Sequence, residues 1–174
     1  MTRTMFTVSA VLFITIAIHG GASAQPRPLT SNAQPGDDAV AADIKVLLNK
    51  YVLIVNAADA GSLRLLWADP DKISFVSPIQ RFTTWKELQG FFDGFLKNSF
   101  TERQLKLSNV TTSSAGDAGW AVFDFEFNAK LKDGQPFQSR GWETQVYRRT
   151  DQGWRITHIH YSVPVTPPPG QAAP

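Results

Sequence analysis

The chain has 174 residues, no cysteine and a formal net charge of +2 at pH 7. Its length favours a single domain, and the near balance of 17 basic and 15 acidic residues argues against nucleic acid as a partner. The lack of cysteine excludes disulfides, thiolate metal sites and cysteine nucleophiles, so the hydrophobic core alone must hold the fold together.

The N-terminus has the pattern of a secretory signal peptide over residues 1–24. Arg3 supplies positive charge, residues 5–18 are an apolar run, and residues 22–24 are the small residues of a cleavage site. We therefore predict cleavage after Ala24 and an exported protein, periplasmic or secreted. The apolar run is shorter than the ~20 residues that span a bilayer, so no membrane association is expected after cleavage.

Two tails flank the predicted domain. Residues 25–36 are rich in Pro, Gln, Ser and Asn, and residues 166–174 are rich in proline. Such segments bury too little apolar surface to fold, so both are predicted to be disordered. Residues 37–165 remain as one domain.

Helices are predicted in the first half of this domain. An apolar stripe at helical spacing predicts a helix over residues 37–58, and a shorter one follows over residues 62–68. A short strand is expected over residues 73–77. Thr84 and Glu87 have the spacing of a capping box, which predicts the start of a third helix with a broad apolar face.

Strands are predicted in the second half, because β-branched and aromatic residues are frequent there. They cover about residues 104–113, 120–130, 137–149 and 154–163. Asp133-Gly134 and residues 151–153 supply the hairpin turns. Helices followed by an antiparallel meander indicate an α+β domain, with the helices packed on one face of a curved sheet.

The last hairpin resembles that of a known superfamily. The element order and the segment Trp-Arg-Ile-Thr-His-Ile-His-Tyr-Ser at residues 154–162 are similar to nuclear-transport-factor-2-like proteins, which include SnoaL-like proteins and ketosteroid isomerase. The nearest pattern is the association domain of calcium/calmodulin-dependent protein kinase II. The resemblance implies a cone-shaped half-barrel, in which three N-terminal helices and a mainly antiparallel sheet enclose a ligand pocket. It also implies a homodimer formed through the sheet.

The chain departs from the association domain at two positions. Arginines project into the cavity of that domain from its last two strands, and here those positions are Gln145 and Tyr161. We therefore do not expect a cavity that holds an anion on arginines. The catalytic Asp, Tyr and Asp of ketosteroid isomerase have no residue-by-residue match, so their roles are not carried over.

The register of the hairpins decides which side chains face the cavity, because a slip of one residue reverses every side chain. Phe123, Phe125 and Phe127 are predicted to face inward. If both later turns have odd-numbered loops, the inner face also includes Glu143, Gln145, Tyr147, Thr157, Ile159 and Tyr161. His158 and His160 then lie outside, beside Trp142 and Trp154. With even-numbered loops the histidines point inward.

Candidate ligand-binding residues are those whose side chains can wall such a cavity. They are Tyr51, Trp67, Phe75, Trp85, Phe92, Phe125, Gln145 and Ile159. The alternative is that the aromatic residues are ordinary core, as is usual at helical spacing.

Glu143 and Tyr161 are the candidate catalytic residues. A carboxyl group buried in an apolar cavity has a raised pKa and suits a general base, and a tyrosine can donate a hydrogen bond to an oxyanion. The alternative is that Glu143 pairs with a neighbouring arginine and that Tyr161 only packs.

His158 and His160 form a second group of candidates, together with Asp124. Two imidazoles and a carboxylate could bind zinc, whereas structural or interface histidines are the expected case. No metal and no cofactor are therefore predicted.

The predicted function is the binding of a small, largely apolar molecule between helices and sheet, in a dimer. One alternative is an isomerase, cyclase or hydrolase that uses Glu143 with Tyr161 or a histidine. The other is a structural assembly module with no ligand.

Overall fold

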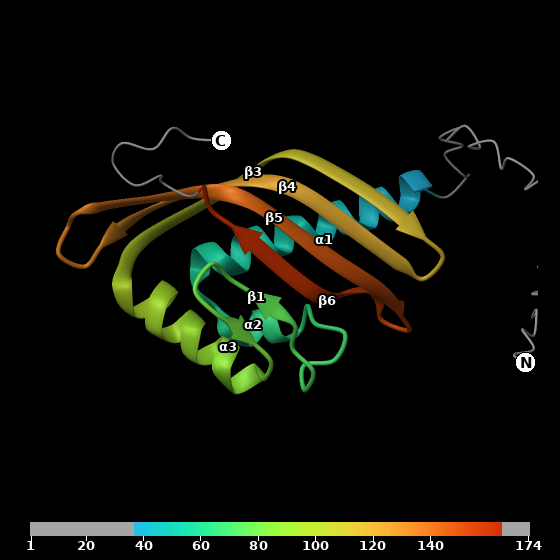
Figure 1. Cartoon of the computed structure of the whole chain (residues 1–174), viewed down its shortest axis with the longest axis horizontal. Coiled ribbons are helices and arrows are strands. Elements are labelled where there is room, and N and C mark those ends of the chain that lie inside the picture. Colours follow the sequence, from blue (N-terminus) through green and yellow to red (C-terminus); the bar gives the residue numbers. More distant parts are fainter. Residues whose placement is uncertain (1–36, 165–174) are drawn as a thin grey trace, which may run out of the picture. The chain divides into compact units, whose positions relative to one another are not determined.

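The computed structural model describes residues 37–164, in which helices come first and a curved sheet follows (Figure 1). The elements in chain order are α1 (Asp37–Ala57), α2 (Ala60–Arg64), β1 (Phe75–Val76), β2 (Arg81–Phe82), α3 (Trp85–Phe91), the π-helix η1 (Phe92–Lys97), β3 (Phe100–Ala115), β4 (Ala118–Leu131), β5 (Pro136–Thr150) and β6 (Gly153–Ser162). The predicted signal peptide, both tails and Val165 lie outside the described residues.

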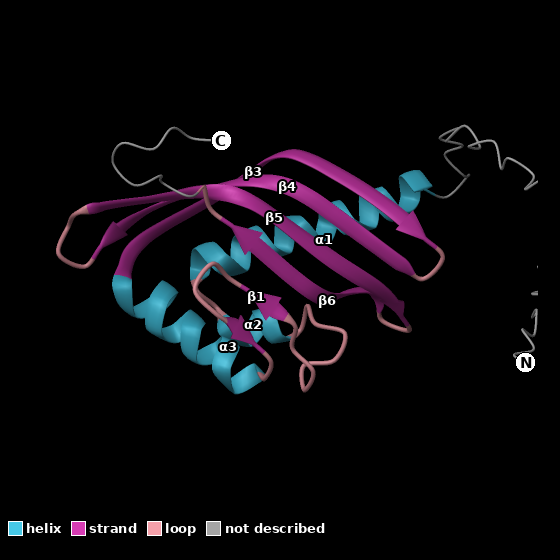
Figure 2. Ribbon diagram, viewed as in Figure 1, coloured by secondary structure: helices cyan, strands magenta, loops and turns pink. Residues whose placement is uncertain are grey.

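The six strands form one sheet in the order β2-β1-β6-β5-β4-β3. All pairs are antiparallel except β1 with β6, which is parallel. Figure 2 shows α1 running along the sheet beside β3 and β4, with α3 next to the short strand β2. The predicted α+β class, with N-terminal helices on a curved and mainly antiparallel sheet, is confirmed.

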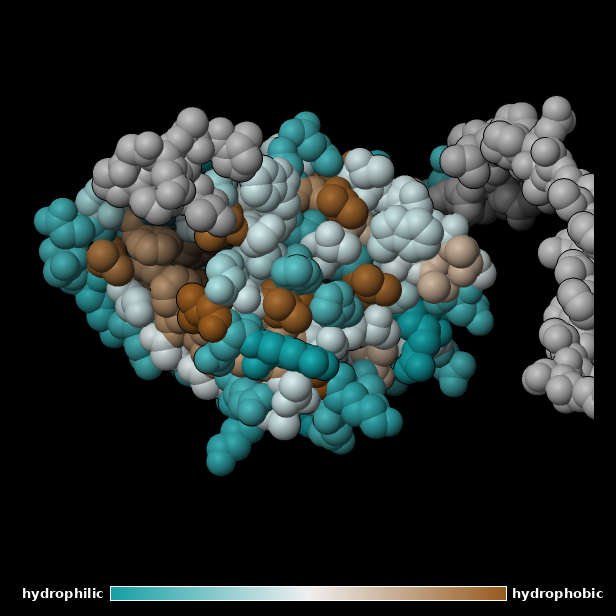
Figure 3. Space-filling model, in the orientation of Figure 1, coloured by the Kyte–Doolittle hydropathy of each residue, from teal (hydrophilic) through white to brown (hydrophobic). Residues whose placement is uncertain are grey.

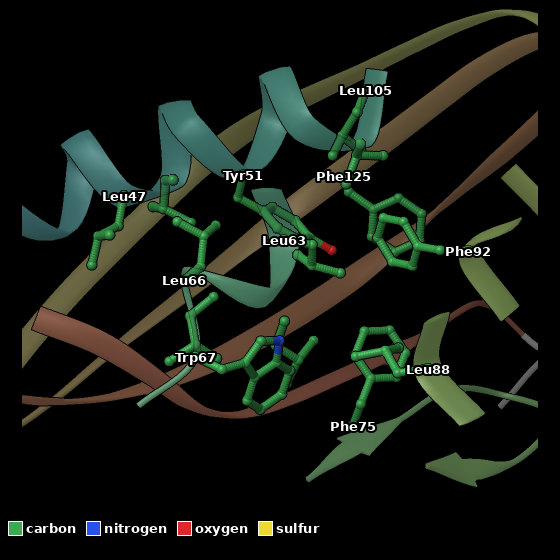
Figure 4. Close-up of a cluster of buried hydrophobic side chains, with 14 of the residues drawn as sticks. Leu47, Tyr51, Leu63, Leu66, Trp67, Phe75, Leu88, Phe92, Leu105 and Phe125 are labelled. Atoms are coloured by element: carbon green, nitrogen blue, oxygen red, sulfur yellow. The ribbon is translucent and has the colours of Figure 1, made fainter. Parts of the chain in front are cut away.

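The core lies between the helices and the inner face of the sheet. The inward stripe of α1 includes Ile44, Leu48 and Tyr51, and on β4 the predicted inward residues Phe123, Phe125 and Phe127 are all buried. Figure 4 shows this cluster, with Tyr51 and Phe125 approaching each other from helix and sheet. No helix within residues 37–164 has an apolar stretch long enough to cross a membrane.

The third helix begins as predicted and continues in an unexpected geometry. Thr84 Oγ1 accepts a hydrogen bond from the Glu87 amide, and the Glu87 carboxylate accepts one from the Thr84 amide, which completes the capping box. After Phe91 the helix becomes the π-helix η1. The apolar spacing predicts a helix but does not distinguish α from π geometry. Short π-helical segments are frequent at functional sites.

A β-bulge in β6 sets the orientation of the last strand. Val146 pairs with His158 and Tyr147 pairs with Ile156, so Thr157 is an additional residue on β6. Its hydroxyl donates a hydrogen bond to the Val146 carbonyl oxygen.

The bulge corrects part of the predicted register. Thr150 pairs with Gly153, so the connecting loop has an even number of residues and would by itself point the histidines inward. The bulge reverses the alternation, so Ile159 faces inward and the histidines face outward. Trp154, expected outside beside the histidines, precedes the bulge and is only 4% exposed.

Gly141 allows the end of β6 to pass over the inner face of β5. A Cβ atom at this position would lie 1.9 Å from the Ser162 carbonyl oxygen and 3.0 Å from the Phe125 ring. We expect Gly141→Ala to lower the free energy of unfolding by about 3 kcal/mol, because a main-chain oxygen cannot rotate away. Urea unfolding measures this. Gly90→Ala is the control, since its Cβ would meet nothing within 4 Å; equal stability of both variants would contradict the prediction.

Candidate functional site

A cavity of about 260 Å³ lies between α1, the α3–η1 helix and the sheet. Its walls are mainly aromatic, from Phe75, Phe91, Phe92, Phe95, Phe125, Phe127 and Phe137. Figure 3 shows hydrophobic side chains gathered around a hollow on the side of the molecule where α3 lies. An engineered apolar cavity of roughly 150 Å³ holds benzene, so this one has room for a somewhat larger molecule.

Few polar side chains line this apolar cavity. They are Tyr51 of α1, Ser139 and Glu143 of β5, and Tyr161 of β6. Glu143 is 5% exposed and lies directly opposite Tyr161 in the β5–β6 ladder. A carboxyl group therefore sits on the cavity wall beside two phenol groups.

The hydrogen bonds of Glu143 come from neutral groups. Gln145 Nε2 donates to Oε1 at 2.6 Å, and the Tyr51 hydroxyl donates to Oε2 at 3.4 Å. No lysine, arginine or histidine among the described residues lines the cavity. Burial raises the pKa of Glu143 to about 7, although both hydrogen bonds act to lower it. Near neutral pH the carboxyl group can therefore both take up and release a proton.

The two tyrosines of the cavity keep their protons. Burial and the nearby Glu143 together raise the pKa of Tyr161 to about 12, while a hydrogen bond with Ser77 acts to lower it. Burial and Glu143 also raise the pKa of Tyr51 well above its ordinary value. Both hydroxyls are thus hydrogen-bond donors, and a base beside such donors can remove a proton from a carbon acid and stabilise the oxyanion that forms.

Comparison with known proteins identifies the family. The family described as "SnoaL-like domain" matches residues 44–166 of this sequence. The chain belongs to the SnoaL-like family. No curated protein matches the sequence.

Solved structures share the SnoaL-like architecture along most of the domain. A nuclear-transport-factor-2-like superfamily protein from Salmonella enterica serovar Typhimurium is 29% identical, with a TM-score of 0.70 over 78% of this chain and 99% of its own. A hexachlorocyclohexane dehydrochlorinase, LinA-type3 from Novosphingobium barchaimii, is 18% identical, with a TM-score of 0.63 over 78% and 95%. A protein with a cystatin-like fold from Caulobacter vibrioides is 19% identical, with a TM-score of 0.61 over 74% and 92%.

The SnoaL-like cavity brings together most of the residues predicted for it. Those that line it are Tyr51, Phe75, Phe92, Phe125, Glu143 and Tyr161. The arginine partner considered for Glu143 is absent from its described surroundings, and its contacts are Gln145 and Tyr51.

Four of the predicted ligand-binding residues do not line the cavity. Gln145 is buried behind Glu143, and Ile159 is buried in the inner face of β6. Trp67 lies beside Ile156 of β6, where the two residues form a parallel bridge. Trp85 packs under the Arg64 guanidinium, whose Cζ is 5.5 Å from the ring centroid.

The prediction did not name Phe91 or Phe137 for the SnoaL-like cavity. Phe91 belongs to the same apolar helix face as Phe92 and Phe95, and the α-to-π transition keeps all three at the wall. Phe137 lies near the start of β5, and its odd number places it in the row of Ser139 and Glu143. The period-2 rule applied to the whole strand would have found it.

The histidines lie on the opposite face of the sheet from the cavity. His158 Nδ1 is 2.8 Å from Ser74 Oγ, and the ring centroids of His158 and His160 are 6.4 Å apart. Burial and the neighbouring His160 lower the pKa of His158. Asp124 accepts a hydrogen bond from Asn109 Nδ2 at 2.6 Å. Within residues 37–164, no three His, Asp or Glu side chains converge as metal ligands would.

Proposed function

We propose that this SnoaL-like protein binds a small, neutral, largely apolar molecule in its cavity and removes a proton from one of its carbon atoms, with Glu143 as the general base. The observation that carries the proposal is a buried carboxyl group on the wall of an aromatic cavity, with no cationic side chain of residues 37–164 in that wall. A neutral substrate is favoured because an anion would meet the Glu143 carboxylate and, from the described part of the chain, no compensating positive charge.

The proposed reaction begins with one proton transfer. Glu143 Oε2 takes the proton, and the electron pair of the broken C–H bond moves onto the substrate, where an adjacent carbonyl oxygen becomes an enolate oxygen. Tyr161 or Tyr51 donates a hydrogen bond to that oxygen. The proton then returns at another carbon in an isomerisation, or a β-leaving group departs in an elimination.

One structural neighbour is named a dehydrochlorinase, and dehydrochlorination removes hydrogen and chloride from a substrate. At 18% identity this neighbour shares the fold, and the proposal for the present chain rests on its own Glu143. Binding without turnover is the alternative that the cavity itself favours. A purely structural module is disfavoured, because the space between helices and sheet is not filled.

The test is proton removal from 5-nitrobenzisoxazole, a neutral bicyclic compound. Loss of its C–H proton breaks the N–O bond and releases a coloured phenolate, so the reaction is followed by absorbance. Catalysis above the rate with an equal concentration of free acetate would support a base in the cavity. Saturable binding with no catalysis would favour a carrier, and no binding would count against both proposals.

A homodimer through the outer face of the sheet and export after cleavage at Ala24 complete the proposal. The outer face exposes Trp120, Val122 and Trp142, and Trp142 is 53% exposed. Large apolar side chains that are grouped on one face are typical of protein interfaces.

We expect Trp142→Glu to convert the dimer to a monomer, because each protomer would bury a carboxylate without a counter-charge in the interface. Sedimentation velocity of the mature protein measures this. Leu53→Glu is the control, since Leu53 is an exposed apolar residue of α1, 68% exposed, away from that face. A wild-type protein that stays monomeric at high concentration would contradict the dimer.

A further inference from the structure

Glu143, Gln145 and Tyr147 form a continuous polar row on the inner face of β5. Gln145 Nε2 donates to Glu143 Oε1 at 2.6 Å, and the Tyr147 hydroxyl donates to Gln145 Oε1 at 2.6 Å. Gln145 is 0% exposed and Tyr147 is 1% exposed. Neither residue lines the cavity, so both lie behind the carboxyl group rather than in contact with a ligand.

The hydrogen bonds of this row all run in one direction. Tyr147 keeps its proton, because burial and the nearby Glu143 raise the pKa of its phenol. Its hydroxyl donates to the oxygen of the Gln145 amide, and the NH₂ group of that amide donates to Glu143, which as a carboxylate can only accept. An amide nitrogen donates and does not accept, so the neighbouring oxygen of Glu143 is held as an acceptor.

The two oxygens of Glu143 are consequently different. Oε1 receives the short hydrogen bond from Gln145, whereas Oε2 receives only the long one, 3.4 Å, from the Tyr51 hydroxyl. A proton placed on Oε1 would point at the N–H of Gln145, whereas a proton on Oε2 meets only the Tyr51 hydroxyl, which can turn its own hydrogen away and accept.

We propose that Gln145, held by Tyr147, is a positioning residue that reserves Oε2 of Glu143 as the atom that exchanges a proton with the ligand. The hydrogen bond to Oε1 persists whether the carboxyl group is ionised or neutral, because Oε1 is an acceptor in both forms. The group therefore takes up and returns a proton without rotating. The catalytic consequence rests on the proposed function, whereas the hydrogen-bond row does not.

The test is a titration of the Glu143 carboxyl group by ¹³C NMR, in protein labelled at glutamate Cδ and without ligand. The Glu143→Gln variant identifies the signal by its loss. Among the described residues, the groups facing Glu143 are Gln145 and Tyr147 on its own strand, Tyr51 of α1, Tyr161 of β6 and Phe123 of β4, and none of them is cationic.

We expect Gln145→Leu to raise the pKa of Glu143 by about one unit or more, because it removes the donor that stabilises the carboxylate. Gln138→Leu is the matched control: it makes the same change at an exposed position of β5, and it should leave the signal unchanged. A folded Gln145→Leu protein with an unchanged Glu143 pKa would overturn the proposal.

Tyr147→Phe provides a second measurement if leucine at position 145 prevents folding. Without the phenol hydroxyl the Gln145 amide loses its fixed orientation, so a smaller upward change of the same pKa is expected. A folded Tyr147→Phe protein with no change would also overturn the proposal. Because the titration contains no ligand, it decides the role of Gln145 even if Glu143→Gln keeps full activity and the proposed function fails.

Discussion

Glu143→Gln is expected to slow the opening of 5-nitrobenzisoxazole by about 10³-fold, within the range that a general base contributes. The amide has nearly the same shape as the carboxyl group and can still accept a hydrogen bond from Gln145, but it cannot take up a proton. The expected loss is therefore in kcat, with little change in KM. Absorbance of the released phenolate gives both constants.

The dependence of this rate on pH provides a second criterion. In the wild type kcat/KM should rise with pH through about 7 and level off above, because only ionised Glu143 accepts the proton. The residual rate of the variant should not follow that curve. Glu102→Gln, which changes an exposed carboxyl group on β3, should retain both the rate and the profile. An unchanged rate in Glu143→Gln would remove Glu143 from the chemistry.

The same substitution is expected to stabilise the folded protein at alkaline pH. The pKa of Glu143 is about 7 in the folded state against an ordinary value of 4.5, because burial disfavours the charged form. The native state therefore binds this proton more tightly than the unfolded chain does. Stability from this group is complete below pH 4.5 and is lost as the pH rises to about 7 and beyond.

The gap between those two pKa values corresponds to roughly 3 kcal/mol at pH 9. Glu143→Gln carries no charge there, so its free energy of unfolding should exceed that of the wild type by about this amount at pH 9 and match it near pH 4.5. Urea unfolding at the two pH values measures the difference, with Glu102→Gln as the control. Equal stability of variant and wild type at pH 9 would mean that Glu143 is not desolvated.

Together the two expectations describe a trade-off in which Glu143 lowers stability and supports activity. An ionised carboxylate in an aromatic cavity lowers the free energy of unfolding, so replacing it stabilises a protein that does not need it for function. A variant that is more stable at high pH and at the same time inactive would be difficult to explain if Glu143 only filled space.

The arrangement of the large elements was predictable because each has a strong local signal. The apolar stripe around Tyr51 predicts α1, the Thr84 capping box predicts the start of α3, and alternating phenylalanines predict the inner face of β4. The two-residue strand β2 was missed, because it pairs only with the equally short β1 and has no pattern of its own.

The site was predictable in part, for a related reason. The alternation of side chains along β5 and β6 places Glu143 and Tyr161 on the inner face of the sheet. A carboxyl group on that apolar face indicates a candidate general base. Alternation does not reveal that Gln145 lies behind this group, or that Trp67 and Trp85 belong to other contacts. Those facts depend on how far each side chain lies from the helices, which local sequence does not encode.

The additional residue in β6 has a consequence for how such sequences diverge. Thr157 has no partner in the β5–β6 ladder. A relative without it would therefore keep Trp154, Ile156, Ile159 and Tyr161 on the inner face of the sheet. Aligned sequences of relatives should accordingly show a gap of one residue at this point, even though it falls inside a strand, where insertions are normally excluded. A single duplication elsewhere between the turn and Tyr161 would have the opposite effect. It would place the imidazole of His160 opposite Glu143 in place of the Tyr161 phenol, and it would change the chemistry of the cavity with no substitution at all.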